Sequence, residues 1–138
     1  MTRLALTAIA LVALVLPASG QAHATLTTAS PKPQSSLESP PSAIELRFDQ
    51  AVTMVDRSIQ VLATDGSILS GPPMLVERGR VIRAELGRLP RGAYTVRWRE
   101  LSADGHVGAG VYTFGVGVAA PPPTEAVGAS GVTWRDDL

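Results

Sequence analysis

Apolar and polar residues alternate along several short stretches of the chain, which is typical of strands with one buried face. The clearest such stretches are residues 44–49, 82–87, 94–99 and 112–116. Residues 58–63 and 73–77 are weaker candidates, and turn-forming pairs such as Asp65-Gly66 lie between the stretches. No segment has the apolar period of a helix. About seven short strands at this spacing predict an all-β protein, an immunoglobulin-like Greek-key β-sandwich or barrel.

The segment LPRGAY, which ends at Tyr94, has two interpretations. It resembles a tyrosine corner, in which a tyrosine hydroxyl binds the backbone a few residues upstream. The alternative is that Tyr94 is only a core residue of the strand that follows.

The first 22 residues have the pattern of a secretory leader. Arg3 supplies a positive end, an apolar run extends from Leu4 to Leu16, and Gly20-Gln21-Ala22 is a small-x-small cleavage site. Cleavage after Ala22 would make His23 the N-terminus, whereas cleavage after Ala24 would remove it. We therefore expect a signal peptide at 1–22 and a periplasmic, exported mature protein.

Composition changes again at Val118, where a proline-rich stretch begins. We expect a single domain at residues 23–117, and a linker with a mobile tail at residues 118–138. No apolar run after the leader approaches the roughly 20 residues that span a bilayer. We also expect a monomer.

Charge and cysteine content narrow the possible functions. The chain has 12 basic and 12 acidic residues and no basic run, so nothing in its charge favours nucleic acid or an anionic membrane. It has no cysteine, which excludes disulfides, thiolate metal sites and thiol catalysis.

The two histidines of the chain are the candidate metal ligands. After cleavage at Ala22, His23 would offer both an amine and an imidazole nitrogen. Asp104 and His106 are two residues apart, so on an extended backbone their side chains would leave the same face. The resulting set of three nitrogens and one oxygen suits Cu(II) in a tetragonal plane, with zinc as a weaker alternative. The other interpretation is that Asp104-Gly105 is a hairpin turn with an incidental histidine.

Two segments of the chain resemble the CopC family of periplasmic copper-binding proteins. They are HATLTTASPKPQSSLESPPSAIELRFDQAV and LPRGAYTVRWRELSADGHVGAGVYTFGV, so the resemblance covers roughly residues 23–117. It implies a small β-barrel or sandwich that holds Cu(II) through the terminal amine and imidazole of His23, with Asp104 and His106. It also implies cleavage after Ala22, a role in copper homeostasis or resistance, and a CopD-type inner-membrane transporter as a possible partner.

The chain departs from the family pattern in two places. Many members have a glutamate shortly after the phenylalanine that matches Phe48, where this chain has Asp49 and Gln50. Gln50 would then be a neutral partner near the metal, or Asp49 would substitute for the glutamate. Some members also bind Cu(I) through a methionine-rich loop. Here Met54 and Met74 are expected to fill the core, without a separate Cu(I) site.

Two other functions stay open. Copper-dependent oxidases of the histidine-brace type, the lytic polysaccharide monooxygenases, also use an N-terminal and a second histidine. They need open coordination positions and an aromatic platform, which this short chain with few aromatic residues does not favour. A metal-free immunoglobulin-like interaction module would bind through its loops. We expect a copper-binding protein that catalyses no reaction.

Overall fold

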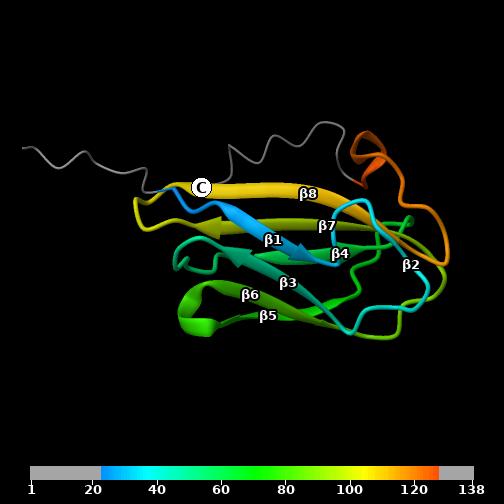
Figure 1. Cartoon of the computed structure of the whole chain (residues 1–138), viewed down its shortest axis with the longest axis horizontal. Helices are drawn as coiled ribbons and strands as arrows, with labels where there is room; N and C mark the ends of the chain where they lie inside the picture. The colour runs from blue at the N-terminus through cyan, green and yellow to red at the C-terminus, as the bar shows by residue number, and fades with distance from the viewer. Residues whose placement is uncertain (1–22, 128–138) are drawn as a thin grey trace, which may run out of the picture.

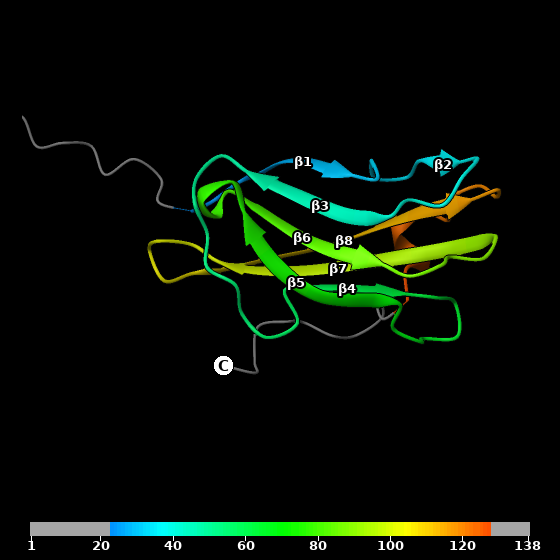
Figure 2. The same ribbon diagram turned by 90° about the horizontal axis from the view of Figure 1, so that it is seen from below.

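The computed structural model describes residues 23–127 and has two four-stranded sheets packed face to face (Figures 1 and 2). The first sheet has the strand order β1 (Leu26–Ser30), β3 (Ala43–Phe48), β6 (Val81–Leu86) and β5 (Ser70–Val76). The second has the order β2 (Ser36–Leu37), β8 (Val107–Val116), β7 (Gly92–Leu101) and β4 (Ile59–Leu62). Neighbouring strands are antiparallel except β2 and β8. The predicted all-β sandwich is therefore confirmed.

The core lies between the sheets and is built from the alternating stretches of the sequence. The buried apolar side chains that form it include Ile44, Leu46, Phe48, Val61, Ile82, Ala84, Tyr94, Val96, Tyr112 and Phe114. Full burial of one such aliphatic or aromatic side chain contributes about 1.5–3 kcal/mol. Because the chain has no cysteine, packing takes the place of disulfides in holding the two sheets together.

Two strands were missed and one is longer than its alternation predicts. β1 and β2 have mostly exposed or half-buried residues, so no apolar alternation marks them. β8 begins at Val107 rather than Tyr112, because its first half contains glycines where the partner strand needs space. A Cβ atom on Gly110 would lie 2.6 Å from the Trp98 indole. Because of these glycines, hydrophobic periodicity identifies only the second half of β8.

The strand β5 lies at an edge of the first sheet. It carries Pro72 and Pro73, which an edge strand tolerates because one side of its backbone needs no partner. The two methionines differ from each other. Met54 packs against the core as predicted, whereas the prediction is wrong for Met74, which is 46 % exposed on β5.

Tyr94 satisfies both interpretations of LPRGAY. Its hydroxyl donates a hydrogen bond to the carbonyl oxygen of Pro90, four residues upstream. Its ring is buried and stacks on Phe114 with ring centroids 5.4 Å apart. The tyrosine corner therefore closes the end of the sandwich at which β7 begins.

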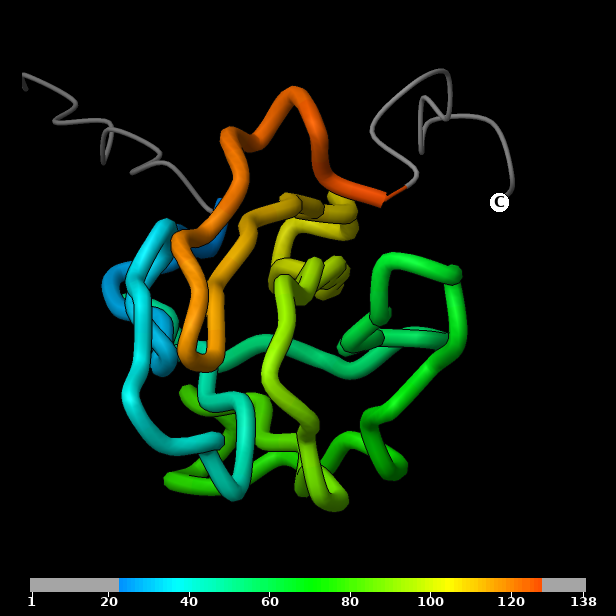
Figure 3. The backbone as a smooth tube through the Cα atoms, turned by 90° about the vertical axis from the view of Figure 1, so that its right-hand side faces the viewer, coloured from blue at the N-terminus to red at the C-terminus, as the bar shows by residue number. Residues whose placement is uncertain are grey.

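The first part of the predicted linker, residues 118–127, contacts the sandwich (Figure 3). Thr113 Oγ1 donates to the carbonyl of Pro121, the backbone N–H of Val127 donates to Thr95 Oγ1, and Ala126 is buried. Residues 118–127 are thus held against the sheet, because proline carbonyls remain good hydrogen-bond acceptors for its side chains. The division into a domain at 23–117 and a linker with a tail at 118–138 stays a prediction. Residues 1–22 and 128–138, where the leader and the rest of the tail were predicted, lie outside the described residues. Among the described residues no helix has the length and apolar character to cross a bilayer.

Candidate metal centre

The loop between β7 and β8 is a tight hairpin that contains Asp104, Gly105 and His106. The N–H of Ser102 donates to the His106 carbonyl at 2.9 Å, and the N–H of Gly105 donates to the Ser102 carbonyl at 3.0 Å. Gly105 has φ +85°, a left-handed conformation that glycine adopts without strain. Such a turn followed by a left-handed glycine is a common hairpin connection.

A hydrogen bond inside this loop positions the carboxylate of Asp104. Its Oδ1 accepts the backbone N–H of His106 at 3.1 Å, so one oxygen holds the turn. The other oxygen, Oδ2, is thereby directed toward the two histidine rings. The extended backbone assumed from the sequence is therefore wrong for these residues. Asp104-Gly105 does lie in a hairpin turn, and this turn itself brings Asp104 and His106 together, so the turn and the candidate metal site are compatible.

The segment around His23 reaches this loop because two successive backbone N–H groups are held by side-chain oxygens. The N–H of Ala24 donates to Ser102 Oγ at 2.9 Å. The N–H of Thr25 donates to Asp49 Oδ1 at 2.8 Å, and the Asp49 N–H donates to the Thr25 carbonyl at 3.0 Å. β1 begins at the next residue, so the edge strand delivers His23 to the hairpin at the same end of the sandwich (Figure 1).

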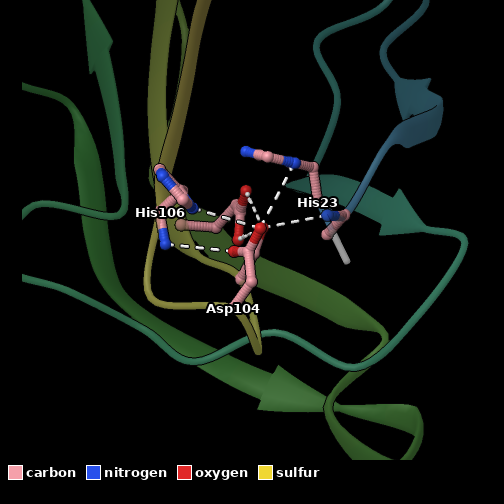
Figure 4. A network of polar contacts seen from close by, with 6 residues as sticks. His23, Asp104 and His106 are labelled. Carbon is pink, nitrogen blue, oxygen red and sulfur yellow. Dashed lines mark hydrogen bonds and ion pairs between the residues drawn. The ribbon is translucent and has the colours of Figure 1, made fainter. Parts of the chain in front are cut away.

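The three predicted ligands form one cluster, with the Asp104 carboxylate between the two rings (Figure 4). Asp104 Oδ2 lies 3.2 Å from His23 Nδ1 and 3.1 Å from His106 Nδ1. One ligand atom from each residue lies within 4.8 Å of the others, and the ring centroids are 4.6 Å apart. Asp104 is 16 % exposed, whereas His23 and His106 are 59 % and 68 % exposed. The carboxylate thus forms the floor of an open, surface site.

The surroundings favour the charged form of Asp104. Partial burial opposes its ionisation, but hydrogen bonds from His106 and the nearby charges of the two histidines outweigh that effect and lower the pKa of Asp104. Metal binding requires the ionised carboxylate, and these contacts favour that form.

Sequence reasoning missed two residues beneath the cluster, Glu100 and Ser102. Ser102 Oγ lies 3.1 Å from Glu100 Oε1, and the Glu100 side chain is only 1 % exposed. Burial raises the pKa of Glu100, although hydrogen bonds from Ser102 and the Gly108 backbone oppose the shift. Its spacing from Tyr94, Val96 and Trp98 is even, so the alternation already put this glutamate on the inward face of β7.

Asp49 has a clear structural role, which differs from direct substitution for the family's glutamate. It holds the backbone of Thr25 and so acts on the segment that carries His23. A role for Gln50 as a neutral partner near the metal stays a prediction.

The donor set fits a borderline divalent metal ion. Two imidazole nitrogens and one carboxylate oxygen, close together and exposed, suit Cu(II), and Zn(II) accepts the same donors in a tetrahedron. Removal of residues 1–22 would add the His23 amine as a fourth donor. Fold and site together therefore define a small β-sandwich with a candidate metal centre where an edge strand meets a hairpin loop.

Comparison with known proteins agrees with this description. The CopC domain matches residues 26–117, which is more than half of the chain, and the protein therefore belongs to the CopC family. The fold is similar to that of solved structures, among them the following two. CopC from Methylosinus trichosporium OB3b is 28 % identical with a TM-score of 0.58, covering 68 % of this chain and 93 % of that one. PcoC, a methionine-rich copper resistance protein from Escherichia coli, is 26 % identical with a TM-score of 0.59, covering 69 % and 99 %.

A longer relative is also similar. Copper transport protein CutJ from Bacillus subtilis is 30 % identical over a match of 107 residues, and this match covers 75 % of this chain. The match covers only 20 % of CutJ, so this chain spans about a fifth of the length of that relative.

Proposed function

We propose that this protein binds one Cu(II) ion in the periplasm, for copper homeostasis or resistance or for hand-over to an inner-membrane transporter of the CopD type. The amine and imidazole of His23, the carboxylate of Asp104 and the imidazole of His106 are the proposed ligands. One observation carries the proposal: both histidine Nδ1 atoms lie within 3.2 Å of the same oxygen of Asp104.

The chemistry of the donors supports copper over other divalent ions. Nδ1 is the ring nitrogen that can close a chelate ring with the amine of the same N-terminal histidine, and it is the one that faces Asp104. Nitrogen and oxygen donors in a tetragonal arrangement suit Cu(II), which also binds most tightly among the divalent first-row metals. The family membership and the names of PcoC and CutJ support the same metal.

The position of Asp104 supports binding rather than oxidation. Its carboxylate lies between the two imidazole rings, where it would occupy a coordination position that oxygen chemistry requires to be open. The protein would therefore hold its copper without catalysing a reaction.

Exposure of the site supports hand-over. Both histidine side chains are more than half exposed, so a partner could reach the metal without unfolding the sandwich. The similarity to one fifth of a copper transport protein is consistent with a transporter as acceptor. The apolar leader at 1–22 supports export, which would also generate the terminal amine.

The test uses protein exported and processed with its own leader, and its intact mass establishes whether His23 is the first residue. An EPR-monitored titration should show a tetragonal Cu(II) signal with nitrogen hyperfine structure that saturates at one equivalent. A variant with one glycine added before His23 keeps both imidazoles but moves the amine. We expect it to bind Cu(II) roughly a hundredfold more weakly, a loss of about 2.7 kcal/mol, in competition with a chelator.

Two results would contradict the proposal. A processed protein that starts at His23 but gives no specific Cu(II) signal would exclude the site. Equal affinity of the extended and the processed protein would exclude the amine as a ligand.

A further inference from the structure

Glu100 is a buried carboxylate that is not one of the proposed metal ligands. It lies near the end of β7 on the inward face, and no ion pair between the described residues includes it. Taking a carboxylate out of water costs free energy unless hydrogen bonds replace its hydration. The fold meets this cost with two donors, the Ser102 hydroxyl and the backbone N–H of Gly108.

The Ser102 hydroxyl connects this carboxylate to the segment that carries His23. A hydroxyl has a single proton to donate and two lone pairs that accept. The N–H of Ala24 can only donate, so Ser102 Oγ accepts from it at 2.9 Å. The one hydroxyl proton is then directed to Glu100, whose two oxygens lie 3.1 and 3.3 Å away. Glu100 thus determines which way the hydroxyl points.

The opposite strand leaves room for the carboxylate. Glu100 and Gly108 are partners in the β7–β8 ladder. A Cβ atom on Gly108 would lie 2.2 Å from Glu100 Oε1, so the carboxylate occupies space that any other residue at position 108 would contest. Glu100 and Gly108 of the hairpin strands and Ser102 of the loop between them therefore form one hydrogen-bonded unit beneath the candidate ligands.

We propose that Glu100 and Ser102 are positioning residues of the metal centre. The relay from Glu100 through Ser102 to the Ala24 N–H holds the backbone next to His23 and thereby keeps the His23 donors within reach of Asp104 and His106. This inference rests on the proposed copper site and adds residues that control its geometry.

The experiment compares Cu(II) affinity in the processed protein with that of Ser102→Ala, Glu100→Leu, the double variant and Glu100→Gln. Ser102→Ala and Glu100→Leu each break the relay, and we expect each to weaken binding roughly tenfold, as loss of an outer hydrogen bond to a metal site does. The double variant should be no weaker than either single one, because both act through the same link. Glu100→Gln retains an acceptor oxygen and should keep most of the affinity.

Stability provides a readout that separates positioning from a structural role. Glu100→Leu removes the desolvation cost of a buried carboxyl group but leaves the Ser102 hydroxyl and the Gly108 N–H without this acceptor. These effects oppose each other, so the thermal stability of the metal-free variant should change little while its copper affinity falls. Thr113→Val is the matched control. Thr113 is also buried and donates to Pro121, but it is separated from the hairpin by half of β8. It should lower stability and leave copper affinity unchanged.

The outcomes are distinct. If Ser102→Ala and Glu100→Leu bind Cu(II) within twofold of a wild type that binds normally, or if their effects add in the double variant, the relay is excluded. A Glu100→Gln variant as weak as Glu100→Leu would show that charge rather than position matters, and would also overturn the relay. Should Glu100→Leu not fold, Ser102→Ala and Glu100→Gln decide the question. Failure of the proposed function differs from all of these, because the wild type itself would then not bind copper.

Discussion

Two turns of this protein have nearly the same local structure but different surroundings: residues 63–67, between β4 and β5, and residues 102–106, between β7 and β8. In each turn the N–H of the first residue, Ala63 or Ser102, donates to the carbonyl of the residue four positions later. The N–H of the turn's glycine donates to the carbonyl of that same first residue. Gly66 and Gly105 have φ +84° and +85°. In each, the aspartate Oδ1 accepts the backbone N–H two residues on, that of Ser67 or His106.

The turns differ in what lies beside them. Leu62 pairs with Thr95 and Leu101 with Val107, so the turns lie at opposite ends of β7. The Ser67 hydroxyl donates back to its own Asp65 at 2.6 Å, which closes that turn on itself. Asp104 instead faces His106 and, from 81 positions earlier in the chain, His23. An Asp-Gly-x turn thus supplies a carboxylate with fixed geometry, and only its tertiary neighbours make it a candidate metal centre.

The test with the largest expected effect replaces the residue that follows the glycine in the turn between β7 and β8. His106→Ala removes one imidazole but keeps the backbone N–H that holds Asp104, so the loop should stay intact. We expect Cu(II) affinity to fall roughly a hundredfold, about 2.7 kcal/mol, with little change in stability because the side chain is exposed. Chelator competition measures the first effect and thermal unfolding the second.

Ser67→His provides the matched control, because it creates a second Asp-Gly-His turn at the far end of β7. It should add no second tight Cu(II) equivalent, since no N-terminal histidine lies beside it. A second equivalent of equal affinity would show that the turn alone makes the site.

The second test concerns the two glycines. A Cβ atom at Gly66 or Gly105 would meet no other atom within 4 Å, so replacement by alanine costs only the left-handed backbone conformation. Gly66→Ala and Gly105→Ala should each destabilise the metal-free protein by about 1–2 kcal/mol in urea unfolding. Equal losses would establish that the turns are locally equivalent, and a neutral effect at one of them would contradict this.

The smallest expected effects concern pH. A side-chain hydrogen bond from Ser67, with its backbone N–H, lowers the pKa of Asp65. For Asp104, burial raises the pKa, but hydrogen bonds from His106 and the nearby charges of His23 and His106 lower it by more. A depressed pKa in the folded state stabilises the fold above the ordinary aspartate pKa of about 3.9, and this stabilisation is lost as pH falls through the folded value.

Asp65→Asn and Asp104→Asn should therefore lower the melting temperature of metal-free protein at neutral pH, and the difference from wild type should shrink in acid. Added salt should reduce the Asp104 effect more, because charge contributes there. A difference that grows as pH falls would mean that the sign of the shift is wrong.

Much of the fold follows from local rules that the sequence carries. Alternation at 44–48 and 94–98 identifies strands because a pleated strand turns every second side chain inward. Tyr94 marks its corner, and both Asp-Gly pairs mark turns. Alternation fails for β1 and the first half of β8, where edge exposure and glycine remove the apolar pattern. Alternation also fails to predict the contacts of residues 118–127. These contacts depend on single hydrogen bonds, such as the one that the Pro121 carbonyl accepts, and not on an apolar pattern.

The candidate ligands could be named from the sequence because the chain has only two histidines and one of them follows an Asp-Gly pair. Their convergence could not be derived from local pattern. It requires β1 to pair with β3, Asp49 to hold Thr25, and Ser102 to hold Ala24, all contacts between distant parts of the chain. Glu100 gives the clearest contrast. The sequence alone puts a glutamate on the inward face of β7. Its partners are Ser102, Gly108 and, through Ser102, Ala24, which is 76 residues away, so only the packed structure determines what Glu100 does.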